Sequence, residues 1–285
     1  MSGGRTRRAV VLTCATLLFV VLVGATYQGV STAVERRRFP FPGRLVDAGG
    51  HQLHLSCTGA GTPTVVLEAP AAAMSAAWGW VQPAVSARTR VCSYDRAGLG
   101  WSEAGDGPYG PETAANELDA LLRNSREAGP YVVVGHGLGA AFARLYAARF
   151  PDRTAGLVLI DAPDLRPTER STELSRLLAI APWMARTGAL RVAPMLSAET
   201  RGLPAASAGA LSAFLNRPDH LTRAARELDT AGVIVARAAA ATVPARIAVT
   251  EVSYGGSGRL ALIAGQRQAG EVAAAIIAAL DALSS

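Results

Sequence analysis

The stretch that decides the fold reads Tyr131-Val132-Val133-Val134-Gly135-His136-Gly137-Leu138-Gly139. Four strand-forming residues run into a glycine-rich turn, and a helical pattern follows with Leu138, Phe142 and Leu145 on one face. Strand, sharp turn and helix together form a nucleophile elbow, whose sequence pattern is G-x-S-x-G. The spacing of this pattern is intact, but its central residue is Gly137, which has no side chain that could attack a substrate.

Length and composition favour a folded domain with a short appendage. The chain has 285 residues, and half of them are apolar, which allows a sizeable core and argues against disorder. The net charge is +6, and every cationic residue is an arginine. These arginines are scattered and no nucleic-acid motif accompanies them, so we exclude nucleic acid as a partner. A weak attraction to anionic membrane surfaces is the expected consequence of the charge.

The N-terminal region has the pattern of a membrane segment. Residues 1–8 form a short basic N-terminus, residues 9–30 a predicted transmembrane signal-anchor, and residues 31–42 a linker. The uncharged run over 9–34 exceeds the roughly 20 residues that a spanning helix needs. A cleaved signal peptide, with export of the remainder, is the alternative, since Val23-Gly24-Ala25 resembles a cleavage site. We favour the anchor because the run continues past a normal signal-peptide core.

Residues 43–285 alternate between strand and helix patterns. The expected strands are 44–48, 52–57, 64–67, 90–94, 131–134, 157–160 and 246–252, and the expected helices are 78–87, 113–126, 139–150 and 271–283. This alternation predicts an α/β fold with a mostly parallel sheet covered by helices on both faces and opened by an antiparallel hairpin. From about 165 to 237 the alternation stops, and short helical patterns broken by prolines predict a helical cap insertion.

These segments together resemble the α/β-hydrolase family, in particular its membrane-anchored bacterial members. The resemblance is carried by residues 43–46, 53–55, 63–68, 90–102, 135–139 and 156–161. It implies the α/β-hydrolase fold with a cap. The stretch before Gly256 is too short for two strands joined by a helix, since such a crossover needs about 10–12 residues. The loss of one C-terminal strand, with any acid that it carried, is therefore left open.

The resemblance also implies a disulfide. The strand order of the family places the second and fourth strands side by side, which makes Cys57 and Cys92 neighbours and a bond between them possible. Such a bond would place the domain outside the cytoplasm, on the outer side of the cell membrane. Two buried free thiols are the alternative. Cys14 lies in the apolar run, and no cysteine or histidine spacing indicates a metal, so we expect no metal and no cofactor.

The family places each catalytic group at a fixed point, and these points can be checked in this sequence. The nucleophile position is Gly137, the base position in the loop after the last strand is Arg259, and Asp161 is the possible acid. Arginine stays protonated and cannot accept a proton from a hydroxyl group. Since both nucleophile and base are substituted, the catalytic triad is degenerate.

The remaining positions concern the oxyanion hole and two histidines. Backbone N–H groups of Leu138 and Ala71 stand at the oxyanion-hole positions, but the neighbouring Pro70 has no N–H and a fixed φ. The resemblance implies that His136 packs behind the elbow and points away from the cleft. His220 lies in the cap beside an acidic residue, which suggests a surface position.

Three functions follow from these observations. The favoured one is a membrane-anchored, catalytically inactive pseudo-hydrolase that binds a small apolar or acyl ligand and contacts the membrane through its N-terminal helix. The second is an active ester or amide hydrolase with a displaced nucleophile, for which Ser75, Ser102 and Cys92 are the candidates. The third is a degenerate protein without function. The sequence does not indicate an oligomeric state.

Overall fold

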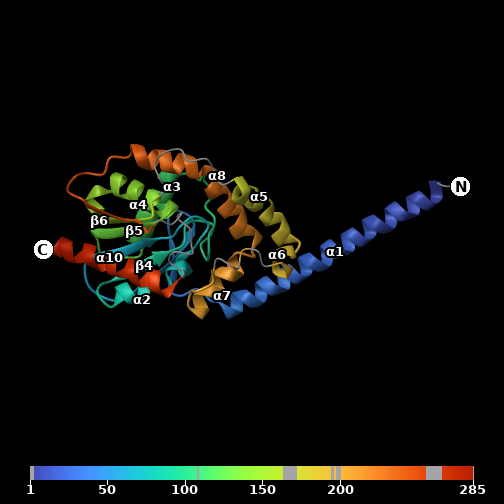
Figure 1. Cartoon of the computed structure of the whole chain (residues 1–285), viewed down its shortest axis with the longest axis horizontal. Helices are drawn as coiled ribbons and strands as arrows, with labels where there is room; N and C mark the ends of the chain where they lie inside the picture. Colours follow the sequence, from blue (N-terminus) through green and yellow to red (C-terminus); the bar gives the residue numbers. More distant parts are fainter. Residues whose placement is uncertain are drawn as a thin grey trace.

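The computed structural model describes residues 3–107, 109–162, 172–193, 196, 200–254 and 265–284. A single long helix, α1 (Gly3–Arg38), projects from a body built of a sheet and its covering helices. The N-terminus lies at the free end of α1 and the C-terminus on the opposite side of the body (Figure 1).

The body is organised around one sheet. Within the described residues this sheet has seven strands in the order β1-β2-β4-β3-β5-β6-β7. Strands β1 and β2 form an antiparallel hairpin, β2 pairs antiparallel with β4, and the remaining pairs are parallel. This arrangement confirms the expected α/β-hydrolase fold. The strands are β1 (Arg44–Asp47), β2 (Gln52–Thr58), β3 (Thr64–Glu68), β4 (Val91–Tyr94), β5 (Tyr131–His136), β6 (Thr154–Ile160) and β7 (Ala248–Val252).

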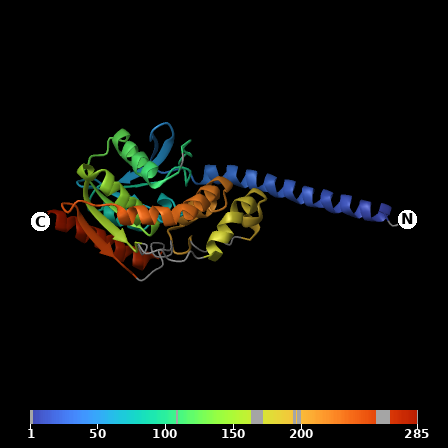
Figure 2. The same ribbon diagram turned by 90° about the horizontal axis from the view of Figure 1, so that it is seen from above.

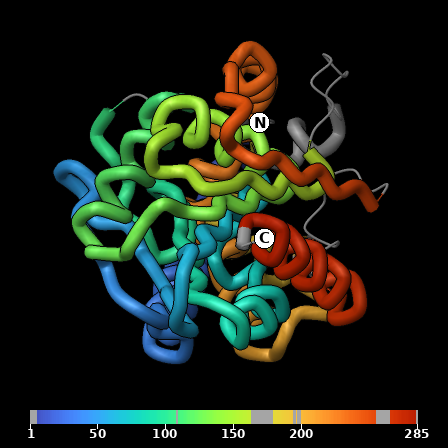
Figure 3. Tube along the Cα trace, turned by 90° about the vertical axis from the view of Figure 1, so that its left-hand side faces the viewer, coloured from blue at the N-terminus to red at the C-terminus, as the bar shows by residue number. Residues whose placement is uncertain are grey.

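Helices cover both faces of the sheet. On one face lie α2 (Val81–Ser86) and α10 (Gln266–Ser284), which pack against each other (Figure 3). On the other face lie α3 (Pro111–Asn124) and α4 (Leu138–Arg149). Two short 3-10 helices, η1 (Ser75–Trp78) and η2 (Pro151–Arg153), precede α2 and β6. The expected helix over 78–87 is thus shorter, because the chain turns between η1 and α2.

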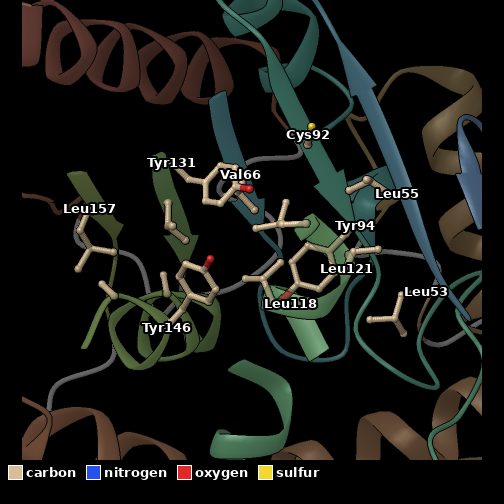
Figure 4. Close-up of a cluster of buried hydrophobic side chains, with 14 of the residues drawn as sticks. Leu53, Leu55, Val66, Cys92, Tyr94, Leu118, Leu121, Tyr131, Tyr146 and Leu157 are labelled. Atoms are coloured by element: carbon tan, nitrogen blue, oxygen red, sulfur yellow. The ribbon is translucent and has the colours of Figure 1, made fainter. Parts of the chain in front are cut away.

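The strand residues alternate between the two apolar cores, as the pleat of a β-strand requires. On β5, Val132 and Val134 join the core under α2 and α10, whereas Tyr131 and Val133 join the core under α3 and α4. Figure 4 shows the second core, in which Tyr131 and Tyr146 lie among leucine side chains. The elbow after β5 is therefore fixed from both sides of the sheet.

Within the described residues, the cap has four helices between β6 and β7. They are α5 (Thr172–Arg186), α6 (Ala189–Val192), α7 (Ala205–Phe214) and α8 (Pro218–Ala240). The second half of α8 packs on α4, where Ile234 and Ala238 contact the cluster that contains Phe142 and Leu138. Helix α8 therefore connects the cap directly to the helix that follows the elbow.

The linker expected over 31–42 is only partly a linker. Helix α1 continues without a break to Arg38, so residues 31–38 are helical. No glycine or proline lies between Gly29 and Pro40, and the carboxylate of Glu35 is held by the Arg191 guanidinium. The backbone N–H of Phe39 still bonds to the Glu35 carbonyl, and the helix stops just before Pro40.

A disulfide joins the first antiparallel strand pair to the rest of the sheet. Cys57 on β2 and Cys92 on β4 face each other in register, with their Cα atoms 4.0 Å apart, and their sulfur atoms are bonded. The Glu127 carboxylate lies close to both sulfur atoms. Because the disulfide removes both thiolates, this group is not a metal-binding site.

Candidate active site

The elbow between β5 and α4 keeps the geometry of a nucleophile turn. Gly137 has φ 56° and ψ −126°, and its N–H donates to the Ile160 carbonyl at 2.9 Å. Side chains with a Cβ rarely adopt this conformation, whereas glycine adopts it at low cost. A Cβ on Gly135 or Gly139 would overlap backbone atoms, so the turn requires small residues on both sides as well. The turn thus has the backbone conformation of a nucleophile elbow, with a residue that lacks a side chain at its centre.

Two residues near Gly137, Asp161 and His136, are buried. Asp161 follows β6 with φ 41°, its N–H donates to the Val252 carbonyl, and its Oδ1 accepts the Tyr254 N–H at 2.8 Å. These bonds give Asp161 a structural role at the strand end. His136 is fully buried, and neither ring nitrogen has a hydrogen-bond partner among the described residues. Burial lowers the pKa of His136 to about 4, so this ring is neutral.

The turn after β3 is the second half of the site. Ala71 packs against the apolar cluster of Leu138 and Phe142, and Ala72 has a positive φ of 59°. The carbonyl oxygens of Ala69 and Pro70 both accept hydrogen bonds from the Arg96 guanidinium, at 2.7 and 3.0 Å. The turn is therefore fixed by protein contacts on each side.

Helix α8 holds both backbone groups of Ala72. The Glu227 carboxylate accepts the Ala72 N–H at 2.8 Å, and the Nε2 of His220 lies 3.1 Å from the Ala72 carbonyl oxygen. His220 and Glu227 are seven residues apart, which places them on the same face of a helix. The surface position expected for His220 is wrong, because this side chain is only 1% exposed. Its burial follows from its place on the face of α8 that covers the turn.

The protonation of His220 follows from its contacts. Its Nδ1 accepts the Gly100 N–H at 3.0 Å, so Nε2 carries the proton and donates to Ala72. Burial lowers the pKa of His220 and keeps the ring neutral. Since both nitrogens are engaged, His220 has no free lone pair with which to act as a general base.

A buried ionic cluster surrounds the same turn. The Arg96 guanidinium contacts Glu68 Oε1 at 2.5 Å and both carboxylate oxygens of Glu227, at 2.8 and 2.9 Å. Tyr94 and Tyr109 donate their hydroxyls to Glu68 and Glu227, respectively. Burial works to lower the pKa of Arg96, but the two carboxylates raise it well above its usual value. Arg96 therefore stays protonated inside the protein, and the neighbouring carboxylates balance its charge.

The three candidate displaced nucleophiles have other roles in the structure. Ser75, His54 and Asp95 do lie together, but Ser75 Oγ and Asp95 Oδ2 both approach the same His54 nitrogen, Nδ1, at 3.3 and 3.1 Å. In a catalytic triad the serine and the acid lie on opposite ring nitrogens. The other nitrogen of His54 contacts the Pro42 carbonyl, and all three side chains are buried. This arrangement is a structural cluster and not a triad.

Ser102 and Cys92 are also held in bonds within the protein. Ser102 Oγ donates to the backbone carbonyl of Asp95 at 2.6 Å and accepts a hydrogen bond from the backbone N–H of His54 at 2.9 Å. Cys92 is fully buried and forms the disulfide with Cys57. The contacts of these residues therefore fix the fold of β2 and β4. Arg259, the residue at the base position, lies outside the described residues.

Sequence reasoning missed the contribution of α8 to this site. Residues His220, Ala224, Glu227, Ala231, Ile234 and Ala238 follow the three- and four-residue spacing of one helical face. A glutamate inside such an apolar stripe is the signal that indicates a buried partner, because buried charges are paired. Its partner, Arg96, lies in the segment 90–102 that carries the family resemblance.

Comparison with known proteins agrees with this geometry. The family model for the α/β hydrolase fold matches residues 63–230. A 2-hydroxy-6-oxo-2,4-heptadienoate hydrolase of Pseudomonas putida is 35% identical over 123 residues, which are 42% of this chain and 44% of the relative. The matched region spans less than half the length of the curated relatives.

Two solved structures share the fold over most of the chain. The enol-lactonase from Burkholderia xenovorans is 20% identical with a TM-score of 0.61, covering 84% of this chain and all of the other. A membrane phospholipase A described as a bacterial virulence factor is 19% identical with a TM-score of 0.61, covering 99% of both chains. The chain belongs to the α/β-hydrolase family.

Proposed function

We propose that this protein is a membrane-anchored pseudo-hydrolase, a family member that performs no serine-hydrolase chemistry. The observation that supports the proposal is Gly137, which occupies the elbow position in the elbow conformation without a side chain. The contacts of Ser75, Ser102 and Cys92 support it further, because each candidate substitute is held in a structural bond. The neutral, doubly bonded His220 offers no replacement base.

The membrane part of the proposal rests on α1. Helix residues Thr6–Arg38 are long and apolar enough to cross a membrane. We propose an uncleaved signal-anchor with the body outside the cytoplasm, since the Cys57–Cys92 disulfide suits an oxidising compartment. The alignment with the membrane phospholipase covers nearly the whole chain and so extends over α1.

The proposed ligand is a small apolar or acyl molecule. Where the cap meets the segment after β3, Leu211 and Phe214 of α7 form a buried apolar cluster with Met74, and Trp101 packs against the Phe214 ring. These apolar surroundings support the proposal, because sites for such molecules are formed mostly by apolar side chains.

The test of inactivity uses a fluorophosphonate probe and p-nitrophenyl butyrate on the detergent-solubilised chain. We expect no labelling and no turnover by the wild type, because loss of triad members costs a rate factor of about 10⁶ in a serine hydrolase. The variants Gly137→Ser and Gly137→Ser/Arg259→His serve as comparison, and gain of labelling by the second would support the assignment of Arg259. Labelling of the wild type that disappears in Ser75→Ala or Ser102→Ala would instead establish the displaced-nucleophile hydrolase.

Ligand binding has its own test. The chain is purified in detergent, and bound molecules are extracted and identified by mass spectrometry, with Phe214→Asp as the matched variant. We expect an acyl-containing molecule in the wild type at a defined stoichiometry and its loss in the variant. An equal, non-stoichiometric lipid content in both proteins would argue against a ligand site and for a protein without this function.

A further inference from the structure

The second half of α1 is docked on the cap along one helical face. Its less exposed residues are Gly24, Gln28, Ser31, Thr32 and Glu35, at the three- and four-residue spacing of one face. The residues before Gly24, from Thr6 to Val23, are all exposed. Helix α1 thus consists of an uncovered apolar half and a half that is fixed to the body.

Two kinds of contact hold the docked half. The turn between α5 and α6 touches α1 closely, because a Cβ on Gly24 would overlap the carbonyl of Thr187. One turn further along, the Arg191 guanidinium donates to Gln28 Oε1 at 2.6 Å and to both oxygens of Glu35, at 2.5 and 2.9 Å. The position of α5 and α6 relative to α1 is therefore defined by both packing and charge.

Helix length gives a position for the membrane surface on α1 when the span is counted from the charged N-terminal end. A hydrocarbon core of about 30 Å needs roughly 20 helical residues at about 1.5 Å each. Counted from the first residue after Arg8, this span runs from Ala9 to Gln28. Its end coincides with the level at which Thr187 meets Gly24 and Arg191 meets Gln28. The α5–α6 turn must then lie at the lipid–water boundary.

The cap exposes large apolar side chains at this level. Ile180 and Trp183, three residues apart on α5, are 53% and 70% exposed, and Val192 at the end of α6 is 82% exposed. The guanidinium of Arg186 lies 5.0 Å from the centre of the Trp183 ring. Figures 1 and 2 both show α5 and α6 beside the middle of α1, where it leaves the body. Tryptophan and arginine are the side chains typical of a membrane interface.

We propose that Ile180, Trp183 and Val192 form a membrane-contact patch that inserts into the headgroup region of the bilayer that α1 spans. The occupant is the lipid bilayer, because the patch is continuous with the docked half of α1 and lies at the boundary set by helix length. The basic run Arg36–Arg38 at the end of α1 favours anionic headgroups at the same surface. This inference rests on the proposed anchoring by α1 and adds to it a fixed orientation of the cap on the membrane.

The experiment measures the depth of two sites in the full-length chain, reconstituted in nanodiscs of phosphatidylethanolamine and phosphatidylglycerol. An environment-sensitive NBD label at the natural Cys14 reports on α1. In a Cys14→Ser background, the label is placed by Trp183→Cys on the patch, or by Ala60→Cys on an exposed loop at the opposite end of the sheet. Quenching by doxyl lipids and by aqueous iodide is compared in discs that hold one copy of the protein, and the measurement is repeated in discs that hold two.

We expect shallow doxyl-lipid quenching at position 183 at least twofold stronger than at position 60, with the reverse order for iodide. Val192→Cys should behave like position 183, which keeps the test valid if one variant folds poorly. Iodide quenching at 183 equal to that at 60, with Cys14 still quenched by lipid, would overturn the patch while leaving the anchor intact. Loss of lipid quenching at Cys14 would instead refute the anchoring itself. Shielding at 183 only in discs with two copies would identify a second copy as the occupant and overturn the proposal.

Discussion

The Glu227 carboxylate accepts the backbone N–H of Ala72 at 2.8 Å, across 155 residues of sequence. A cap helix thus supplies an anionic oxygen to the turn after β3, on which hydrolases of this fold rely for an oxyanion hole. The same carboxylate is held by Arg96 and by the Tyr109 hydroxyl. The cap and the sheet are therefore joined by a fully buried charge.

Replacement of Glu227 by alanine should destabilise the protein by about 3 kcal/mol or more, because it leaves Arg96 buried with one carboxylate fewer. Urea unfolding of the detergent-solubilised chain, followed by tyrosine and tryptophan fluorescence, measures the loss. Glu112→Ala is the matched control, since Glu112 is half-exposed and lies 4.0 Å from Arg237, and should cost less than about 1 kcal/mol. Equal losses in the two variants would refute the structural role of Glu227.

The His54–Asp95 pair predicts a dependence of stability on pH. Burial works to lower the pKa of His54, but the Asp95 charge, its hydrogen bond and the Pro42 carbonyl together raise it. The pKa of His54 is thus higher in the folded state than its unfolded value of about 6.5. Protonated His54 therefore stabilises the fold fully below about pH 6.5, and this stabilisation is lost as the pH rises through the folded pKa. The free energy of unfolding should therefore fall above about pH 6.5 in the wild type and fall less in His54→Gln. Parallel curves from pH 5 to 9 would exclude this pair as the cause.

The elbow predicts that a serine restored at position 137 costs stability. Gly137→Ser places a Cβ at φ 56° and ψ −126°, and we expect a loss of about 1 kcal/mol or more and a lower melting temperature. Gly107→Ser is the control, because Gly107 is exposed and a Cβ there would meet nothing within 4 Å. A melting temperature for Gly137→Ser above that of the wild type would contradict the prediction.

Much of the fold could be predicted from local patterns. Strands such as Thr64–Glu68 and Tyr131–His136 are short apolar segments that are followed closely by a proline or a glycine. Both features are visible in the sequence, so the existence of these strands could be predicted from it. The extension of α1 over 31–38 was missed because its contact with Arg191 spans 156 residues of sequence. Local patterns carry no information on such a partner.

The candidate site was predictable only in part. The empty position at Gly137 could be found because a motif with fixed spacing surrounds it. The place of Glu227 in an apolar stripe indicates burial but does not identify its partner, and His220 gives no such signal, because polar residues on a predicted cap helix are normally assigned to the solvent side. The Glu227 carboxylate can be buried because its charge is paired with that of Arg96, which lies 131 residues away in the sequence. The helical pattern alone therefore does not reveal which residue pairs with Glu227.

The disulfide predicts sensitivity to reduction. Cys57 and Cys92 close a loop of 35 residues, for which the chain-entropy model gives about 4 kcal/mol of stabilisation. Cys57→Ser/Cys92→Ser should lose about this amount, and a reductant should lower the stability of the wild type but not of the double variant. Cys14→Ser is the control, since Cys14 lies exposed on α1 and forms no disulfide. An unchanged response of the wild type to reductant would show that the bond does not contribute.

The junction between α1 and the cap predicts a strong coupling between Glu35 and Arg191. Their side chains are only 18% and 7% exposed, so their ion pair is poorly screened by solvent. A double-mutant cycle with Glu35→Gln and Arg191→Gln should give a coupling energy well above 1 kcal/mol, since about 1 kcal/mol is the upper range for exposed pairs. The Arg88–Asp281 pair, with side chains 61% and 53% exposed, is the matched control and should couple by about 0.5 kcal/mol or less. Equal coupling in the two cycles would mean that α1 is not held against the cap by this contact, and the cap would then be free to change its angle to the membrane.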